Sequence, residues 1–426
     1  MMTASRIRPR LSAGVLLLLA LTLPLVSGCD DESLTAPEVQ NDRFNSYVAL
    51  GNSITAGFQS GGINSQTQSE SFAALLSQQM QTPFGVPELN RPGCPPPFEQ
   101  FFRNEIPAPQ RPAGTDSNTC AFRNEQGPLR VNNVAVPRAQ VADVTSNQTS
   151  STNALTQFIL GGRTQAQAAR ALNPTFATIW IGNNDVLSPA LNGTANAPTP
   201  NEFRSQYTSM LDNLTADGTL EGGVLIGVAN VTFLPFFSPG PVYFGLDQQG
   251  QFPQNFNVAS NCDTQDPNTD LTPLVPLEYG FSLIGQATQN PGQTVTLDCQ
   301  AANTPVLTLT EVLTLAGTVQ QYNTFIQQQA QQRDLAFLDP NDVLGALYTN
   351  DDRDQDPTND LIPKFPDRDS DQPFGQFFSL DGVHPSAATH KVVADQLVRV
   401  INETYNLDED LPRLENVPSL PTGNDQ

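Results

Sequence analysis

The stretch YVALGNSITAGFQ, residues 47–59, begins as an apolar strand and continues as a turn of small and polar residues. Its apolar part ends at Gly51, and Ser53 follows two positions later. Ligands of an open parallel sheet bind beyond the carboxyl ends of its strands, so Ser53 stands where a site would form. Serine is also common in turns, and the stretch alone leaves both roles open. Ile54 and Thr55 exclude a G-x-S-x-G nucleophile elbow, and no Gly-Lys-Ser/Thr follows that would bind phosphate.

Apolar segments of strand length alternate with helical patterns along the chain. The predicted buried strands are residues 46–50, 130–136, 176–181, 223–231 and 335–339. The clearest predicted helices are residues 69–80, 310–333 and 386–402. Thr308 and Glu311 fit a capping box at the start of the second of these helices, which has one apolar face. This alternation predicts an α/β sandwich with a parallel sheet of about five strands.

Two long stretches, at about 83–129 and 236–305, interrupt this pattern and are rich in Pro and Asn. Loops of this length are usually functional or irregular, so we interpret both as loop-rich insertions on one domain spanning 45–408, with a tail at 409–426. Each insertion holds two cysteines, and four cysteines allow three connectivities. Because each pair brackets one insertion, we favour the disulfides Cys94–Cys120 and Cys262–Cys299. No CxxC or CxxH spacing suggests zinc.

The N-terminus is typical of a processed export signal. Three arginines precede an apolar core at 13–26, which contains Pro24 and is too short to span a bilayer comfortably. The core ends in VSGC, residues 26–29, which resembles a bacterial lipobox. Ordinary cleavage with an incidental Cys29 is the alternative, but position, charge and apolar length together favour lipidation of Cys29. We therefore expect a signal peptide at 1–28, a polar tether at 29–44, and a membrane-anchored lipoprotein on the periplasmic or cell-surface side.

The chain is strongly acidic, with a formal net charge of −23. Loss of the three arginines of the signal would make it three units more negative, −26. Such a surface repels nucleic acid, so a nucleic-acid partner is not expected. A salty habitat and ordinary solubility explain the charge equally well.

The sequence FSLDGVHPS, residues 378–386, places Asp381 three positions before His384. Histidine is the side chain best suited to act as a base near neutral pH, and the chain has only two. His384 lies in a loop before the last predicted helix, whereas His390 falls within that helix and is expected to be a surface or packing residue. The alternative is a helix-entry turn without chemistry.

A third polar turn follows the strand in IWIGNND, residues 179–185. An asparagine amide at this place can donate a hydrogen bond to a developing oxyanion. A plain turn rich in Asn and Asp is the alternative interpretation.

Together these segments resemble the SGNH, or GDSL-type, hydrolases, over roughly residues 47–407. The four matching blocks stand in the family's order: GNSIT (51–55), NNVAVPRAQVADV (132–144), GNND (182–185) and DGVHP (381–385). The resemblance implies a flavodoxin-like three-layer α/β/α fold and ester hydrolysis that needs no metal or other cofactor. It implies Ser53 as nucleophile, His384 as base and Asp381 as the acid that orients the base. The oxyanion would be bound by the Ser53 N–H and by Asn184.

Two positions depart from the family pattern. Asn52 stands where the first block usually has aspartate, and Arg138 stands where the second block usually has a glycine whose N–H joins the oxyanion hole. Arg138 keeps an N–H, but at positive φ it would cost on the order of 1 kcal/mol more than glycine. The third oxyanion donor is therefore expected to be the main chain of Arg138.

An acidic run at 350–371 contains two alternating sets of aspartates. Alternating aspartates suggest Ca²⁺, but neither set fits an EF-hand, and a solvated acidic loop is favoured. The predicted protein is a monomeric serine esterase or lipase acting on a small ester or lipid. An O-acetyl esterase acting on acetylated polysaccharide, or a degenerate surface binding lipoprotein, are the alternatives.

Overall fold

A computed structural model of the chain describes residues 39, 41–121, 123–127, 130–146, 156, 158–349 and 361–420. The predicted signal peptide, Cys29 and the first set of aspartates, Asp352, Asp354 and Asp356, lie outside the described residues. No helix within the described ranges is long and apolar enough to cross a membrane.

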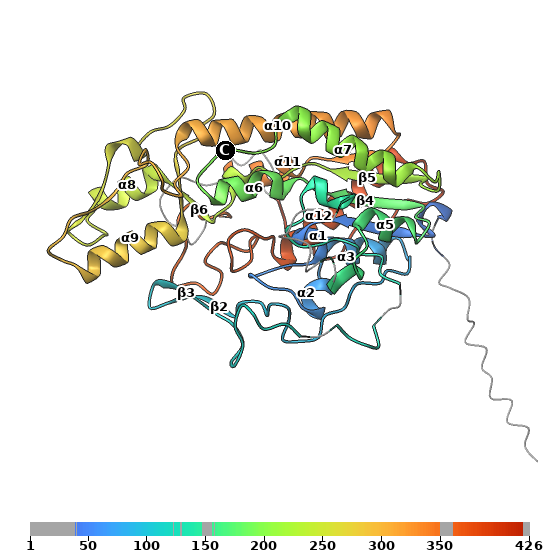
Figure 1. Ribbon diagram of the computed structural model, residues 1–426, viewed down its shortest axis with the longest axis horizontal. Helices are drawn as coiled ribbons and strands as arrows, with labels where there is room; N and C mark the ends of the chain where they lie inside the picture. Colours follow the sequence, from blue (N-terminus) through green and yellow to red (C-terminus); the bar gives the residue numbers. More distant parts are fainter. Residues whose placement is uncertain are drawn as a thin grey trace, which may run out of the picture. The chain divides into compact units, whose positions relative to one another are not determined.

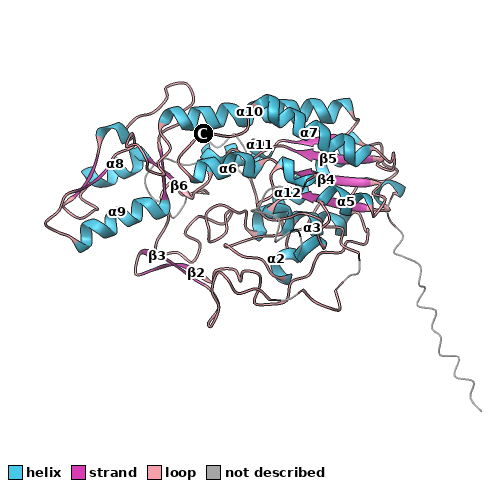
Figure 2. Cartoon of the chain, in the orientation of Figure 1, coloured by secondary structure: helices cyan, strands magenta, loops and turns pink. Residues whose placement is uncertain are grey.

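The centre of the fold is a parallel sheet, which Figures 1 and 2 show between two layers of helices. Its four strands are β1 (Tyr47–Gly51), β4 (Phe176–Trp180), β5 (Gly222–Ile226) and β10 (Ala336–Leu338). They lie in the order β1-β4-β5-β10, with Tyr47 beside Phe176 and Phe176 beside Gly222. The predicted α/β fold with a central parallel sheet is confirmed.

The fifth predicted strand, 130–136, runs beside β1 but forms only one isolated parallel bridge, between Asn133 and Ala49. Main-chain hydrogen bonds join the segment to β1, and its asparagine side chains add further bonds to main-chain groups. Asn132 Nδ2 donates to Tyr47 O at 2.8 Å, and Asn133 Nδ2 donates to Thr55 O at 2.7 Å. The central sheet therefore has four strands instead of the expected five, and the segment 130–136 flanks its edge.

The strand predicted at 223–231 ends early for a similar reason. Asn323 of the long helix accepts the Val228 N–H at 2.7 Å and donates to Val228 O at 2.9 Å. A side-chain amide thus replaces the next ladder partner, and β5 stops at Ile226.

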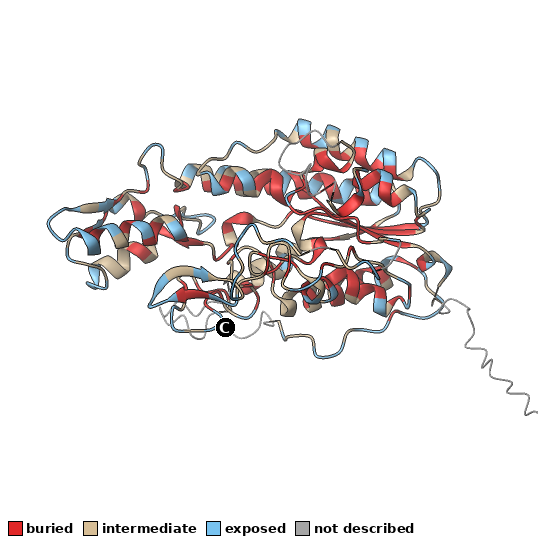
Figure 3. Cartoon of the chain, turned by 60° about the horizontal axis from the view of Figure 1, so that its bottom comes forward, coloured by how far each residue is buried: buried red, intermediate tan, exposed pale blue. Residues whose placement is uncertain are grey.

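Alternation along the strands builds the two outer layers. Val48, Leu50 and Leu225 face α7 (Pro200–Thr215) and α10 (Leu309–Gln332). Their neighbours in the strands, such as Tyr47, Ala49 and Val224, face α3 (Phe72–Gln79) and α12 (Ala387–Thr404). Figure 3 shows the strands of the central sheet largely buried and the helices around them buried on one side. The α10 helix begins with the predicted capping box of Thr308 and Glu311.

The first insertion contains little regular structure. Its hairpin consists of β2 (Gln100–Arg103) and β3 (Ile106–Gln110), which pair antiparallel. A disulfide joins Cys94 to Cys120.

The second insertion is more ordered than the predicted loop-rich stretch. It contains β6 (Phe237–Pro239), α8 (Gly240–Gln248), β7 (Phe256–Val258), η4 (Ser260–Cys262), β8 (Leu274–Pro276), α9 (Leu277–Gln289) and β9 (Val295–Leu297). A disulfide joins Cys262 to Cys299. Its apolar residues form a separate core that includes Tyr243, Phe256 and Leu297, and this core stabilises elements that are each too short to fold alone.

The remaining elements are η1 (Asp42–Phe44), α1 (Ser53–Ala56), α2 (Ser65–Ser69), η2 (Val141–Val144), α5 (Gln165–Arg170), α6 (Asn183–Leu191), η3 (Val231–Phe233) and α11 (Pro340–Thr349). Both ends of the folded region extend beyond the predicted 45–408. Phe44 is fully buried, and Leu411 is 2% exposed. Arg413 pairs with Asp395 of α12, so part of the predicted tail packs on the domain.

Candidate active site

Ser53 is the first residue of α1, directly beyond the carboxyl end of β1. Asn52 caps this helix, because its Oδ1 accepts the Ile54 N–H at 3.0 Å. Asparagine and aspartate cap helices about equally well, so Asn52 can fill the usual aspartate position without a charge. A Cβ on Gly51 would lie 2.6 Å from Trp180 O, so the strand can turn into α1 here only with glycine.

Gln165, at the start of α5, fixes the peptide groups before the serine. Its Oε1 accepts the Gly51 N–H and its Nε2 donates to Gly51 O, both at 2.9 Å. Gln165 is 1% exposed, so solvent does not compete for these bonds. The amide therefore acts like a partner strand at the point where β1 ends.

The structure brings Ser53, His384 and Asp381 together from opposite ends of the chain. His384 Nε2 lies 2.9 Å from Ser53 Oγ, and His384 Nδ1 lies 2.8 Å from Asp381 Oδ2. The Phe58 ring packs on the imidazole with a centroid separation of 4.8 Å. These distances match a nucleophile that a base can deprotonate and a carboxylate that orients the base.

The Asp381 carboxylate accepts several hydrogen bonds. Oδ1 accepts the N–H groups of Val383 at 2.9 Å and His384 at 2.8 Å, and the Ser379 hydroxyl at 3.2 Å. Burial alone would raise the pKa of Asp381, but the His384 imidazole and these hydrogen bonds outweigh it and lower the pKa to about 2. Asp381 is therefore ionised at any pH at which the protein would be assayed.

Arg138 occupies a tight turn between residues 136 and 139. The Ala139 N–H donates to Val136 O at 3.1 Å, Pro137 precedes Arg138, and Arg138 has φ +67°. This is the pattern of a type II turn, in which the third residue is usually glycine. Within the described residues no acceptor binds the Arg138 N–H, and the Arg138 side chain is exposed. The turn is tied to the serine strand because Val136 N donates to Gly51 O at 3.2 Å.

Asn184, on the first turn of α6, lies against the same turn. Its Nδ2 donates to Ala139 O at 2.9 Å, which uses one of its two amide hydrogens and leaves the other. The next residue, Asp185, accepts the Val141 N–H at 3.1 Å. Burial raises the pKa of Asp185 to about 7, with the Val141 hydrogen bond opposing and Asp143 adding to the shift.

A family model described as GDSL-like Lipase/Acylhydrolase matches residues 47–397. The chain belongs to this family. It is a serine ester hydrolase, and the matched range contains all three of Ser53, Asp381 and His384. Among curated proteins, none matches the chain.

Several solved structures resemble this GDSL-like hydrolase at low identity. An acetylxylan esterase from Geobacillus stearothermophilus is 14% identical, with a TM-score of 0.36, and the match covers 84% of this chain and 94% of that one. An α/β hydrolase from the metagenome of Lake Arreo, Spain, is 13% identical over 85% and 97% of the two chains, with a TM-score of 0.35. An extracellular lipase from Streptomyces rimosus is 12% identical over 85% and 100%, with a TM-score of 0.34.

The second histidine of the hydrolase is a core residue. His390 is fully buried on α12, and its Nδ1 accepts the N–H of Phe72, the first residue of α3, at 3.2 Å. Burial and the nearby His384 lower the pKa of His390 to about 3, so it is neutral near pH 7. Of the two predicted environments, surface and packing, the structure shows packing.

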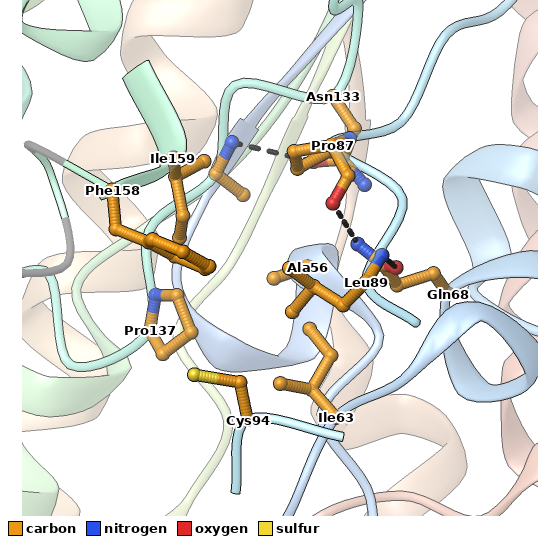
Figure 4. A pocket seen from close by; sticks show the side chains of 11 residues that line it. Ala56, Ile63, Gln68, Pro87, Leu89, Cys94, Asn133, Pro137, Phe158 and Ile159 are labelled. Carbon is orange, nitrogen blue, oxygen red and sulfur yellow. Dashed lines mark hydrogen bonds between the residues drawn. The ribbon is translucent and has the colours of Figure 1, made fainter. Parts of the chain in front are cut away.

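An apolar cavity of about 20 Å³ lies beside α1 (Figure 4). Ala56, Leu89, Pro137 and Phe158 contribute to its lining. Its volume suits one water molecule or methyl group. None of Ser53, Asp381 and His384 lines it.

The second set of aspartates in the acidic run is described. Asp367 Oδ1 accepts the Asp369 N–H at 3.1 Å, and Asp369 and Asp371 are exposed. Across the described part of the chain, no three His, Cys, Asp or Glu side chains lie together as a metal would require.

The sequence analysis did not identify the residues that support the site, namely Gln165, Asp185, Ser379 and Gly61. Gly61 donates its N–H to Asp381 Oδ2 at 2.6 Å. Ser379 and Asp185 stand inside the motifs around Asp381 and Asn184, and their place in these motifs was the available signal. Gln165 and Gly61 are distant in sequence from what they contact, and only the fold reveals them.

Proposed function

We propose that this hydrolase cleaves carboxylic esters with Ser53 as nucleophile, His384 as general base and acid, and Asp381 as the group that orients the imidazole. The observation that carries this is the continuous path from Ser53 Oγ through His384 to Asp381, at 2.9 and 2.8 Å. Because Asp381 accepts from Nδ1, Nε2 is the nitrogen without a proton and can take the serine proton.

The reaction then runs in two halves. Ser53 Oγ attacks the ester carbonyl while its proton passes to His384 Nε2, and a tetrahedral oxyanion forms. Collapse breaks the bond to the alcohol, which leaves with the proton from Nε2, and an acyl-serine remains. Water attacks the acyl-serine with His384 again as base, the acid is released, and Ser53 regains its proton.

The oxyanion would be bound by the N–H groups of Ser53 and Arg138 and by the Asn184 side chain. The unbonded Arg138 N–H and the spare amide hydrogen of Asn184 support this assignment. Both donors are held in place before substrate arrives, which is what makes oxyanion binding effective.

We further propose that the enzyme is exported and held on a membrane by lipid on Cys29. The apolar segment and VSGC sequence support export, and the two disulfides are typical of proteins outside the reducing cytosol. Replacing Cys29 with alanine should release the protein, because the acyl chains would be its only anchor. Retention of Cys29→Ala on membranes after a high-salt wash would contradict this.

Labelling with a serine-directed fluorophosphonate tests the assignment of the nucleophile. Wild-type protein should be labelled, and Ser53→Ala should not. A panel of p-nitrophenyl esters of increasing acyl length, run beside acetylated xylan, identifies the substrate class. If protein that is labelled hydrolyses neither the p-nitrophenyl esters nor acetylated xylan, the proposal of ester cleavage at this site is wrong.

A further inference from the structure

The first insertion reaches the catalytic loop through one arginine. Arg111 follows β3, and its Nη1 donates to Gly61 O at 3.0 Å and to Pro96 O. The guanidinium carbon lies 4.3 Å from the centroid of the Phe98 ring, so the cation stacks on an aromatic face. Planar stacking and two carbonyl contacts together define one orientation for this half-buried side chain.

Gly61 connects Arg111 to the triad, because its carbonyl binds Arg111 and its N–H binds Asp381. Its N–H donates at 2.6 Å to Asp381 Oδ2, the same oxygen that lies 2.8 Å from His384 Nδ1. Gly61 has φ +66°, and a Cβ there would lie 2.5 Å from the Phe98 ring. The insertion therefore packs directly on the residue whose main chain binds the catalytic carboxylate.

The neighbouring residue joins the same two segments. Ser60 N donates to Ser379 Oγ at 2.8 Å, and Leu380 N donates to Ser60 Oγ at 3.2 Å. On the other side, Phe98 N donates to Ser60 O at 2.7 Å. The turn at Ser60 and Gly61 is thus held between the insertion and the loop that carries Asp381.

The charge of Arg111 is suited to this place. Burial lowers the pKa of Arg111, and the negative charges of Asp116 and Asp381 offset part of that shift. A guanidinium stays protonated in proteins, and its hydrogen bonds to carbonyl oxygens are stronger than those of neutral donors. Removing it would leave Gly61 O and Pro96 O without this donor and the turn free to shift.

We propose that Arg111 is a positioning residue for the Asp381–His384 pair, acting through Gly61. The inference rests on the proposed function of that pair. Arg111 would set the angle at which Asp381 meets the imidazole, and hence the approach of Nε2 to Ser53 Oγ. Displacements of about 1 Å in such arrangements can lower turnover by about 10²-fold.

The test is Arg111→Met, which removes charge and hydrogen bonds but keeps much of the side-chain length. The matched control is Arg103→Met in β2, because Arg103 is exposed and, among the described residues, no hydrogen bond or ion pair is seen for its side chain. Measurements on a neutral p-nitrophenyl ester give kcat and KM, with active sites counted by fluorophosphonate labelling and Tm recorded for each variant.

For Arg111→Met, kcat per labelled site should fall about 10-fold, with KM within about two-fold of wild type. Arg103→Met should match wild type. A kcat per site within two-fold of wild type, or a rise in KM alone, would overturn the inference. If Arg111→Met does not fold, Arg111→Lys should still lose at least about three-fold in kcat. Failure of both to fold would show a purely structural role. Unlabelled, inactive wild-type protein would instead contradict the proposed function, and this inference with it.

Discussion

The two disulfide-bonded insertions bury their apolar side chains in different ways. The second insertion buries Tyr243, Phe256, Val275 and Leu297 against one another in a core of its own. The described residues of the first insertion form no such core of their own. Its Phe101 and Phe102 pack against Phe281 of the second insertion and against Phe374, which lies near the C-terminal end of the domain.

We expect this difference to decide how closely each insertion is coupled to the proposed catalytic residues. The first insertion depends on neighbours for stability, and those neighbours include the turn that binds Asp381. The second insertion meets the catalytic loop at its base, where Phe236 N donates to Gly382 O at 2.9 Å. We therefore expect changes in the second insertion, which has its own core, to affect the triad less than changes in the first insertion, which packs on the turn that binds Asp381.

The comparison assumes that the loop around Asp381 and His384, which both insertions contact, takes part in catalysis. Ser53→Ala and His384→Ala should each lower kcat by roughly 10⁴-fold or more, because a serine hydroxyl without a base is a poor nucleophile. Steady-state hydrolysis of a p-nitrophenyl ester measures this, with circular dichroism as the control for folding. Near-normal turnover in either folded variant would remove the basis for the comparison.

The proposed oxyanion donors provide a control that does not depend on either insertion. The Asn184 amide donates to Ala139 O, and Ala139 belongs to neither insertion. Asn184→Ala removes a side-chain donor and should cost roughly 10²–10³ in kcat. Arg138→Ala keeps the main-chain N–H and should cost only a few-fold. Equal losses on one neutral ester would show that the guanidinium binds the oxyanion or substrate.

The disulfides test the comparison directly. Replacing either pair by alanines should destabilise the fold by roughly 2–5 kcal/mol. Loss of Cys94–Cys120 should also lower kcat per active site several-fold, because residues 94–98 form hydrogen bonds with the turn at 60–63. Loss of Cys262–Cys299 should leave kcat per active site unchanged. The measurements are thermal unfolding and site-counted turnover, and equal kcat losses would contradict the proposed difference.

His390 gives the smallest expected effect on turnover. His390→Ala should keep kcat per active site near wild type while lowering stability by roughly 2–4 kcal/mol, through a cavity and an unpaired Phe72 N–H.

The stability effect of His390 should depend on pH. The folded pKa of about 3 lies below the unfolded value near 6.5, so the unfolded state binds the proton first as pH falls. Wild-type stability from this group is complete above pH 6.5 and declines toward pH 3. The difference in Tm between wild type and His390→Ala should therefore shrink below pH 6.5, and a constant difference would contradict the buried, neutral imidazole.

The sequence by itself determined four of the five predicted strands, the capped long helix and the motifs around Ser53, Asn184 and His384. These are local patterns: alternation and apolar runs mark buried strands, and Gly-bounded polar turns mark their ends. Of the three possible cysteine connectivities, the one favoured from the place of each pair in the chain is the one that the structure shows.

Only the tertiary structure decided which residues support the site. Asn132, Asn323 and Gln165 each use a side-chain amide in place of a strand partner, and no sequence period signals such a contact. Arg111 and Gly61 are 50 residues apart yet act together on Asp381. The core of the second insertion likewise could not be predicted from its sequence, because its short elements are not stable alone and form only when they pack together.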